Sequence, residues 1–345
     1  MIRFDSDYIE GCHPRILQAL ADTNMEQTPG YGMDEHCDRA RAMIRAACAA
    51  PQADVHFLVG GTQTNTTVIA SVLRPWEGVF CADTGHINCH ETGAIEATGH
   101  KVLALPHENG KITAAQLRAA AETLKHDANY EHIVQPGMVY ISQPTEYGTM
   151  YTKQELTDIF AACRDEGLPL FIDGARMGYG LAADETLTLA DYAALCDVFY
   201  IGGTKCGFLF GEAVVILNEA IKPCFRNMIK QRGGMLAKGR LLGIQYEEMF
   251  RDRLYFEVCA GAIEKARRIR AALLEVGIPL AFDSPTNQLF PVLNRAQQAK
   301  LSERFALGVW DTTGGESDTF RICTSWATTE ENTAALIAEI RELQK

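Results

Sequence analysis

Residues 198–207 of this chain read VFYIGGTKCG, a short apolar run followed by two glycines and a single lysine, Lys205. The apolar run predicts a buried strand, and the glycine pair predicts a tight turn that presents the lysine. Residues 170–176 read LFIDGAR, a second apolar run that ends in Asp173 and leads to Arg176. The two stretches therefore predict an acid and a lysine at the ends of two buried strands.

An acid and a lysine placed in this way suit pyridoxal phosphate. The lysine amine can hold the aldehyde of the cofactor covalently, and the carboxylate of Asp173 can keep the pyridine nitrogen protonated, so that the ring accepts electrons. Arg176 can form a two-pronged pair with a substrate carboxylate. Each residue also has an ordinary alternative, because Lys205 can be an exposed loop lysine and Asp173 the cap of a following helix. The three residues together favour the cofactor.

The composition limits the possible classes of protein. Of the 345 residues, 47% are hydrophobic and 22% charged, which allows one large domain and a smaller one. A net charge of −12 argues against nucleic acid or an anionic membrane as a partner. The 11 cysteines include no C-x-x-C pair, and residues 1–5 show no apolar signal-peptide core. We therefore expect a cytoplasmic protein with reduced, mostly buried thiols.

Strand-like and helix-like segments alternate from residue 55 to residue 217. This alternation predicts an α/β domain with a mostly parallel sheet, whose ligands bind at the carboxyl ends of the strands. Thr113 is expected to cap a helix over residues 113–126. After residue 226 the pattern becomes helical and then mixed, which predicts a smaller α+β domain. We expect an arm with two helices over residues 1–50, a large domain over 51–250 and a small domain over 251–345.

Residues 60–65, GGTQTN, follow a predicted strand and open a predicted helix. Glycines allow close backbone approach, and the helix N-terminus supplies free N–H groups, so the stretch suits a phosphate monoester. It lacks the G-x-G-x-x-G pattern and the Walker lysine, which argues against a dinucleotide or ATP. The alternative is an ordinary turn between a strand and a helix.

His86 and His90 are spaced to share one face of a helix, which would allow a metal site, but no third ligand stands at a telling distance, and we expect no metal. The favoured alternative is that His86 stacks on a cofactor ring. Cys206, next to Lys205, is expected to be a packing residue rather than a nucleophile.

These motifs, in this order, resemble the low-specificity L-threonine aldolases, which belong to the β-eliminating lyase/threonine aldolase group of fold-type I pyridoxal phosphate enzymes. The resemblance covers nearly the whole chain. It is carried by Asp5-Ser6-Asp7, Tyr31-Gly32, Gly61-Thr62-Gln63, Gly85-His86, Asp173-Gly174-Ala175-Arg176, Thr204-Lys205, Gly233-Gly234-Met235 and Arg321. It implies a three-layer αβα large domain with a mostly parallel sheet and a smaller C-terminal α+β domain.

The resemblance also implies roles for individual residues. Lys205 would carry the cofactor, with Thr204 beside it, Asp173 would pair with the ring nitrogen, and His86 would stack on the ring. The remaining roles are phosphate binding by Gly61, Thr62 and Gln63, carboxylate binding by Ser6, Arg176 and Arg321, and access to the site by Tyr31 from a neighbouring subunit of a homo-oligomer, commonly a tetramer arranged as a dimer of dimers.

Two positions depart from the family pattern. Residues 144–148 read PTEYG where the family often has a histidine near the substrate hydroxyl, which places Glu146 at that position. Leu236 follows Gly-Gly-Met where the family often has an arginine, which leaves Lys238 as the candidate phosphate ligand.

The first hypothesis for function is a retro-aldol lyase acting on threonine-like β-hydroxy-α-amino acids, with His86, Glu146 or water as the base. The second is β-elimination with Lys205 as the base, which would follow if the Cα–H bond were the one aligned with the ring. An aminotransferase is a weaker third option. A non-catalytic nucleotide- or phosphate-binding protein would explain the glycine-rich turn but not the set of Asp173, Lys205 and Arg176.

Overall fold

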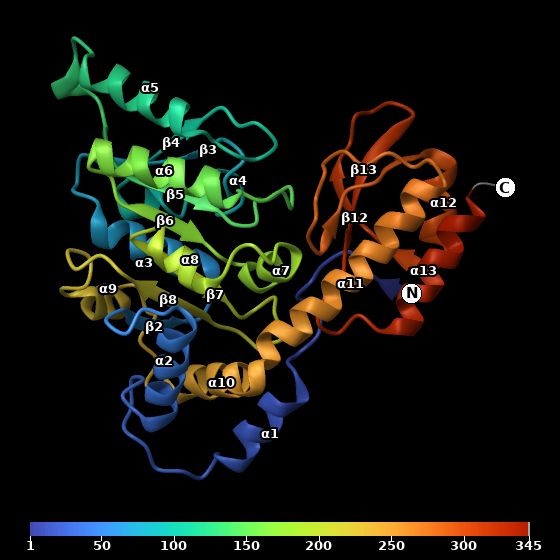
Figure 1. The fold of residues 1–345 in the computed structure, drawn as a ribbon, viewed down its shortest axis with the longest axis horizontal. Helices are drawn as coiled ribbons and strands as arrows, with labels where there is room; N and C mark the ends of the chain where they lie inside the picture. Colours follow the sequence, from blue (N-terminus) through green and yellow to red (C-terminus); the bar gives the residue numbers. More distant parts are fainter. Residues whose placement is uncertain (344–345) are drawn as a thin grey trace.

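The computed structural model describes residues 1–343, and its centre is a seven-stranded sheet in the order β2–β8–β7–β6–β5–β3–β4 (Figure 1). The strands are β2 (Asp54–Leu58), β3 (Glu77–Ala82), β4 (Lys101–Leu105), β5 (Gln135–Ser142), β6 (Leu170–Asp173), β7 (Val198–Gly202) and β8 (Glu212–Ile216). The strands from β7 to β4 are parallel, whereas β8 runs antiparallel to both β2 and β7. Every residue of β6, β7 and β8 is buried, which is why these strands read as unbroken apolar runs.

Helices cover both faces of this sheet and make three layers. Alternate residues of β7 enter different cores, since Phe199 and Ile201 pack in one cluster and Val198 and Tyr200 in the other. One face is covered by α3 (Gly61–Val72), α4 (His86–Cys89) and α9 (Phe225–Gln231). The other is covered by α1 (Pro14–Asp22), α2 (Glu35–Ala47), α5 (Ala114–Lys125), α6 (Lys153–Glu166), α7 (Met177–Ala183), α8 (Leu189–Ala194) and α10 (Arg240–Phe250). Two short 3₁₀ turns, η1 (Glu96–Thr98) and η2 (Tyr130–His132), lie in the connections.

The predicted helix over residues 113–126 is present as α5, and Thr113 caps it. The Thr113 hydroxyl accepts from the backbone N–H of Gln116, whose side chain in turn accepts from the backbone of Thr113. Thr152 and Glu155 form the same reciprocal arrangement at the start of α6. These capping boxes satisfy N–H groups that the first helical turn leaves free, so the sequence fixes where both helices begin.

The second lobe is built on α11 (Leu254–Glu275), which Figure 1 shows running from the large sheet to the small one. In its sheet, β13 pairs with β10, β12 and β9, all antiparallel. The elements of this lobe are β9 (Gln288–Leu289), β10 (Val292–Asn294), α12 (Arg295–Ser302), β11 (Phe305–Ala306), β12 (Gly308–Asp311), β13 (Ser317–Cys323) and α13 (Glu330–Glu342). Helices α11 and α13 pack together over its core.

The first fifty residues contribute to both lobes. Strand β1 (Ile2–Arg3) pairs in parallel with β11 of the small lobe, whereas α1 and α2 pack against α10 of the large one. Residues 4–12 therefore cross from one lobe to the other, past the carboxyl edge of the large sheet. The residue numbers that we assign to the domain boundaries remain a prediction.

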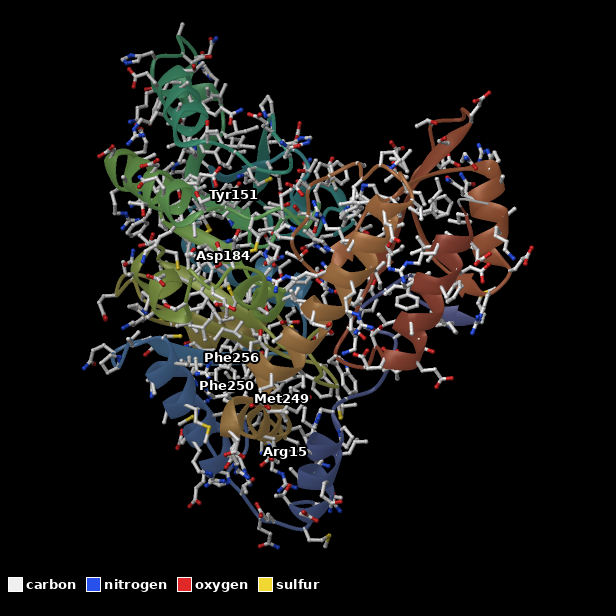
Figure 2. The ribbon with its side chains drawn as sticks, turned by 45° about the vertical axis from the view of Figure 1, so that its right-hand side comes forward. Arg15, Tyr151, Asp184, Met249, Phe250 and Phe256 are labelled. Carbon is white, nitrogen blue, oxygen red and sulfur yellow. The ribbon has the colours of Figure 1, made fainter. Side chains whose placement is uncertain are left out.

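The junction of α10 and α11 supports the end of β7. The region predicted to hold one or two long helices contains two, separated by η3 (Arg251–Arg253), where Asp252 and Arg253 have φ values of 55° and 61°. Figure 2 shows Met249, Phe250 and Phe256 gathered at this junction, and the rings of Phe250 and Phe256 meet edge to face. Two tyrosines of these helices reach the strand itself: the hydroxyl of Tyr246 donates to Ile201 O (2.6 Å) and that of Tyr255 to Gly202 O (2.9 Å). These two hydrogen bonds fix the end of β7 that precedes Lys205.

Candidate active site

Lys205 follows β7 in a turn that tolerates no side chain at two positions. A Cβ on Gly202 would lie 2.4 Å from Ala175 O, and a Cβ on Gly203 would lie 2.7 Å from Gly211 O. The hydroxyl of Tyr179 donates to the carbonyl of Lys205 (2.6 Å), which fixes the backbone of the lysine. Burial and the nearby charge of Arg176 lower the pKa of the Lys205 amine. A lowered pKa increases the neutral, nucleophilic fraction of the amine, as covalent capture of an aldehyde requires.

Lys205 and Asp173 line one cavity at the carboxyl edge of the large sheet, with a volume of about 190 Å³. The predicted residues in its wall are Gly61, Thr62, His86, Glu146, Asp173, Arg176, Thr204 and Lys205. They come from the ends of β2, β3, β5, β6 and β7, as the parallel strands of the sheet require. A larger hollow of about 700 Å³ lies against α5 and α6, and it contains none of the predicted site residues.

Asp173 is a buried carboxylate with a full set of donors. The hydroxyls of Tyr140 and Tyr200 donate to it at 2.6 and 2.5 Å, the amide of Asn65 at 3.1 Å and the backbone N–H of Ala175 at 3.0 Å. Burial alone would raise the pKa of Asp173, but the charge of His86 and these hydrogen bonds lower it overall. The group is therefore an anion at neutral pH, suited to pair with the protonated nitrogen of a cofactor ring.

His86 stands at the first turn after β3 and is held by a second buried acid. Its Nδ1 lies 2.7 Å from Oε1 of Glu91, and the same oxygen accepts from the amide of Asn65 at 2.7 Å. Burial opposes protonation of His86, but the hydrogen bond to Glu91 and the charge of Asp173 raise its pKa overall. One polar network thus joins His86, Glu91, Asn65 and Asp173. Sequence reasoning missed Glu91 as a member, although it lies only five residues after His86.

The start of α3 forms a cradle for a phosphate. Gly60 precedes a helix of 12 residues and makes no side-chain cap, so the backbone N–H groups of the first turn remain available. Gln63 has a scaffold role, because its Oε1 accepts from Val59 N (3.2 Å) and its Nε2 donates to Arg232 O (3.3 Å).

Thr204 is also engaged within the protein. Its hydroxyl donates to Oε1 of Glu212 (2.8 Å) and accepts from Gly211 N (3.1 Å). Burial raises the pKa of the Glu212 carboxyl to about 8, and this acid also lines the cavity. Thr204 and Glu212 therefore set the floor of the site beside Lys205. Sequence reasoning missed Glu212, because an acid at the start of a strand gives no distinctive pattern.

Arg176 is paired to Asp7, which sequence reasoning also missed. Nε and Nη2 of Arg176 lie 2.6 and 3.0 Å from the two oxygens of Asp7, and the amide of Asn287 donates to the same acid at 2.9 Å. Asp7 is fully buried, which would raise its pKa, but the charge and hydrogen bonds of Arg176, with the charge of Lys205 and the hydrogen bond from Asn287, together lower the pKa to about 2.

Ser6 and Arg321, the other two residues expected to bind a carboxylate, have hydrogen-bond donors that are not used within the protein. The hydroxyl of Ser6 and Nε of Arg321 are buried and have no partner within the described part of the chain. Nη2 of Arg321 donates to Asp5 O at 3.0 Å, which ties β13 to the segment that carries Ser6. Such orphaned donors, next to the Asp7–Arg176 pair, fit an acceptor from outside the protein, such as a substrate carboxylate.

Tyr31 and Lys238 lie outside the cavity wall of this single chain. Tyr31 is 47% exposed, and Nζ of Lys230 stands over its ring at 5.0 Å. Lys238 is exposed in the connection before α10. The structure of one subunit does not bring either residue to Lys205.

Fold and site define a class of protein. The structure superposes on a threonine aldolase of Leishmania major with a TM-score of 0.96 and 46% sequence identity, covering 100% of both chains. The histidinol-phosphate aminotransferase of Clostridium acetobutylicum shares the fold alone, with a TM-score of 0.75 at 13% identity over 100% of this chain and 99% of the other. The architecture is that of the fold-type I enzymes, which depend on pyridoxal phosphate.

Sequence comparison gives the family. The model of the β-eliminating lyases matches residues 4–317. A low-specificity L-threonine aldolase from a Pseudomonas species is 30% identical over 98% of this chain and 97% of its own length. The chain belongs to the β-eliminating lyase family, and the resemblance drawn from the sequence motifs is confirmed.

Proposed function

We propose that this protein is a pyridoxal 5'-phosphate-dependent aldehyde-lyase that cleaves L-threonine, L-allo-threonine or related β-hydroxy-α-amino acids to glycine and an aldehyde. The observation that carries the proposal is one cavity that holds the amine of Lys205, the buried anion of Asp173 and the open N-terminus of α3. Those three features fit the aldehyde, the ring nitrogen and the phosphate of that cofactor. The names of the relatives at 46% and 30% identity supply the reaction.

The cofactor, when bound, would act as an electron sink for the pair of electrons released at Cα. The residues of this chain would do the remaining work. Asp173 would hold a proton on the ring nitrogen, and His86 would lie against the ring. Ser6 and Arg321, with Arg176 beside them, would bind the α-carboxylate and so fix which bond at Cα stands perpendicular to the ring. Thr62 and the first N–H groups of α3 would bind the phosphate, with Gln63 and Thr204 shaping the cradle around it.

The proposal extends to assembly and location. Tyr31 and Lys238 would reach the site of a neighbouring subunit in a homo-oligomer, a dimer of dimers, which accounts for their position away from Lys205 in their own chain. We place the protein in the cytoplasm, because each of its 11 cysteines is free. Within residues 1–343, no helix combines the length and the apolar character that crossing a bilayer requires.

Product identification tests the proposal directly. Purified protein with the cofactor would be incubated with threonine, allo-threonine, phenylserine, serine and cysteine. We expect glycine and an aldehyde from the first three. Keto acid and ammonia in place of the aldehyde would indicate β-elimination rather than the retro-aldol reaction. Amino-group transfer to a 2-oxo acid would indicate an aminotransferase. Failure to take up the cofactor at all would overturn the whole assignment.

A further inference from the structure

Glu146 stands in the cavity wall on a loop just after β5 and is held by two hydrogen bonds to one of its oxygens. Its Oε1 accepts from the backbone N–H of His86 (2.8 Å) and from the hydroxyl of Ser142 (2.6 Å). Both donors lie at the carboxyl edge of the sheet, Ser142 at the end of β5 and His86 at the turn after β3. The carboxyl group is thus held in one orientation toward the space that Lys205 and Asp173 share.

The second oxygen, Oε2, has no partner from another residue. Within residues 1–343, no lysine, arginine or histidine nitrogen forms an ion pair with Glu146, and both hydrogen bonds from other residues use Oε1, beside an interaction of the carboxyl with the backbone N–H of Glu146 itself. A carboxyl group pinned by one oxygen, with the other free at a cavity, is built to exchange a proton with a bound molecule. A structural carboxylate in such a place would normally be paired with a cation.

His86 is less suited to accept a proton. Its Nδ1 is committed to Glu91 at 2.7 Å, and this buried acid favours the protonated imidazolium. The raised pKa of His86 reduces the fraction of the neutral ring, which is the only form with a lone pair to offer. Glu146 has a lone pair on Oε2 and forms no ion pair within the described part of the chain.

We propose that Glu146 is the general base that removes the β-hydroxyl proton of the substrate as the Cα–Cβ bond breaks. The inference rests on the proposed function. The O–H bond breaks and its proton passes to Oε2. The electron pair of that bond becomes the second bond of the aldehyde carbonyl, and the pair from Cα–Cβ stays with the amino-acid fragment. A proton then returned to Cα completes glycine.

The protonation of Glu146 would set the acid side of the pH profile. Burial, with the charge of Asp173, raises the pKa of this carboxyl overall, although the hydrogen bonds from Ser142 and from its own backbone N–H and the charge of His86 act in the opposite direction. The titratable groups that interact with it are Cys81 on β3, His86 and Cys89 on α4, Tyr140 on β5, Tyr147 and Tyr151 on the following loop and Asp173 on β6. Because the ionised form is the base, kcat/KM is expected to fall as the pH drops through this pKa.

The test compares Glu146→Gln with the wild type and with Glu185→Gln, the same change at an exposed residue between α7 and α8. Glutamine keeps an oxygen for His86 N and Ser142 but cannot take a proton. We expect aldehyde release to fall about 10²–10⁴-fold. The visible absorption of the bound cofactor and the exchange of glycine α-protons with D₂O, which involve no β-hydroxyl, should stay within threefold of the wild type. Glu185→Gln should match the wild type throughout.

A second readout does not depend on turnover. Infrared difference spectra between the wild-type holoenzyme and Glu146→Gln would be recorded against pH. They should show the carbonyl band of one protonated carboxyl, and this band should disappear as the pH rises through the acid limb of the wild-type profile. Aldehyde release within threefold of the wild type, an unchanged acid limb or loss of glycine exchange in Glu146→Gln would each overturn the assignment of the base. Absence of aldehyde from the wild type would instead overturn the proposed function.

Discussion

The two ends of the candidate site, one around Asp173 in the cavity and one around Ser6 and Arg321 beside it, differ in how their polar groups are occupied. At the end around Asp173, four donors converge on one carboxylate: two tyrosine hydroxyls, an amide and a backbone N–H. At the end around Ser6 and Arg321, buried donors lack partners within the described chain. Under the proposed function, the first or occupied end would hold the cofactor and the second or open end would receive the substrate. Changes at the two ends should therefore produce different kinetic signatures.

Replacing Lys205 by alanine should have the largest effect, because it would remove the amine proposed to hold the cofactor covalently, on which both ends depend. We expect aldehyde release to fall by about four orders of magnitude or more. The visible band of the lysine-bound cofactor should vanish, as an absorption spectrum after addition of the cofactor would show. Arginine at the same position keeps the charge but cannot form the bond, so it serves as the control. A coloured, active Lys205→Ala protein would contradict the site altogether.

Asp173→Asn should lower the rate of the reaction while the cofactor still binds. An amide cannot balance a positive ring nitrogen, so the charge on which electron withdrawal depends would be lost. We expect kcat to fall about 10²–10³-fold, as when one preorganised electrostatic partner is removed. Steady-state kinetics with saturating cofactor measures the change, while Kd for the substrate, taken from spectral titration, should change little. An effect confined to KM would contradict the assignment of Asp173 to the cofactor rather than to the substrate.

The two arginines give the sharpest contrast at the open end. Arg321→Gln should raise KM about 10–100-fold, because a charge-assisted contact to the substrate carboxylate is worth about 1.5–3 kcal/mol. The stability of the fold should change little. Arg176→Gln should also lower the free energy of unfolding by about 3–5 kcal/mol, since it leaves Asp7 buried without its cation. Kinetics and urea denaturation of both variants separate these outcomes, and equal loss of stability in both would contradict the pairing.

The Asp7–Arg176 pair also predicts the smallest effect, a dependence of stability on pH. The folded-state pKa of Asp7 is lowered to about 2 from 3.8, so the unfolded chain binds the proton more readily. The stabilisation is complete above the unfolded pKa and is lost as the pH falls through the folded one, an amount of about 2 kcal/mol. Urea denaturation of the wild type and Asp7→Asn between pH 5 and pH 2 measures it. The difference between the two should shrink toward low pH, and a constant difference would contradict the assignment.

The occupied end is the part that the sequence predicts well. Lys205 and Asp173 follow continuous apolar runs. Parallel strands that are buried on both faces produce such runs, which are easy to recognise in a sequence. The direction of a strand is less legible, and nothing in residues 212–216 indicates that β8 runs antiparallel to its neighbours. The two tyrosines that hold Asp173 read only as strand residues, because a buried phenol and a buried phenyl ring fit the same apolar pattern.

The open end depends on contacts that no local pattern records. Asp7 and Arg176 are separated by 169 positions, and Asn287 joins them from the other lobe. The motif around Arg176 predicts a contact with a carboxylate. It does not show that Arg176 is already paired with a carboxylate of the chain itself, that of Asp7. Tyr31 and Lys238 would need a neighbouring subunit, which the sequence of one chain does not place.

The pairing of β1 with β11 has a practical consequence for anyone who trims or tags this enzyme. Residues 2–7 hold together a strand of the small lobe, an unpartnered hydroxyl at Ser6 and the counter-ion of Arg176. Removing these few amino acids would therefore remove a strand and, under the proposed function, groups that position the substrate carboxylate, although Lys205 lies about two hundred positions downstream. Affinity handles belong at the opposite terminus, beyond α13.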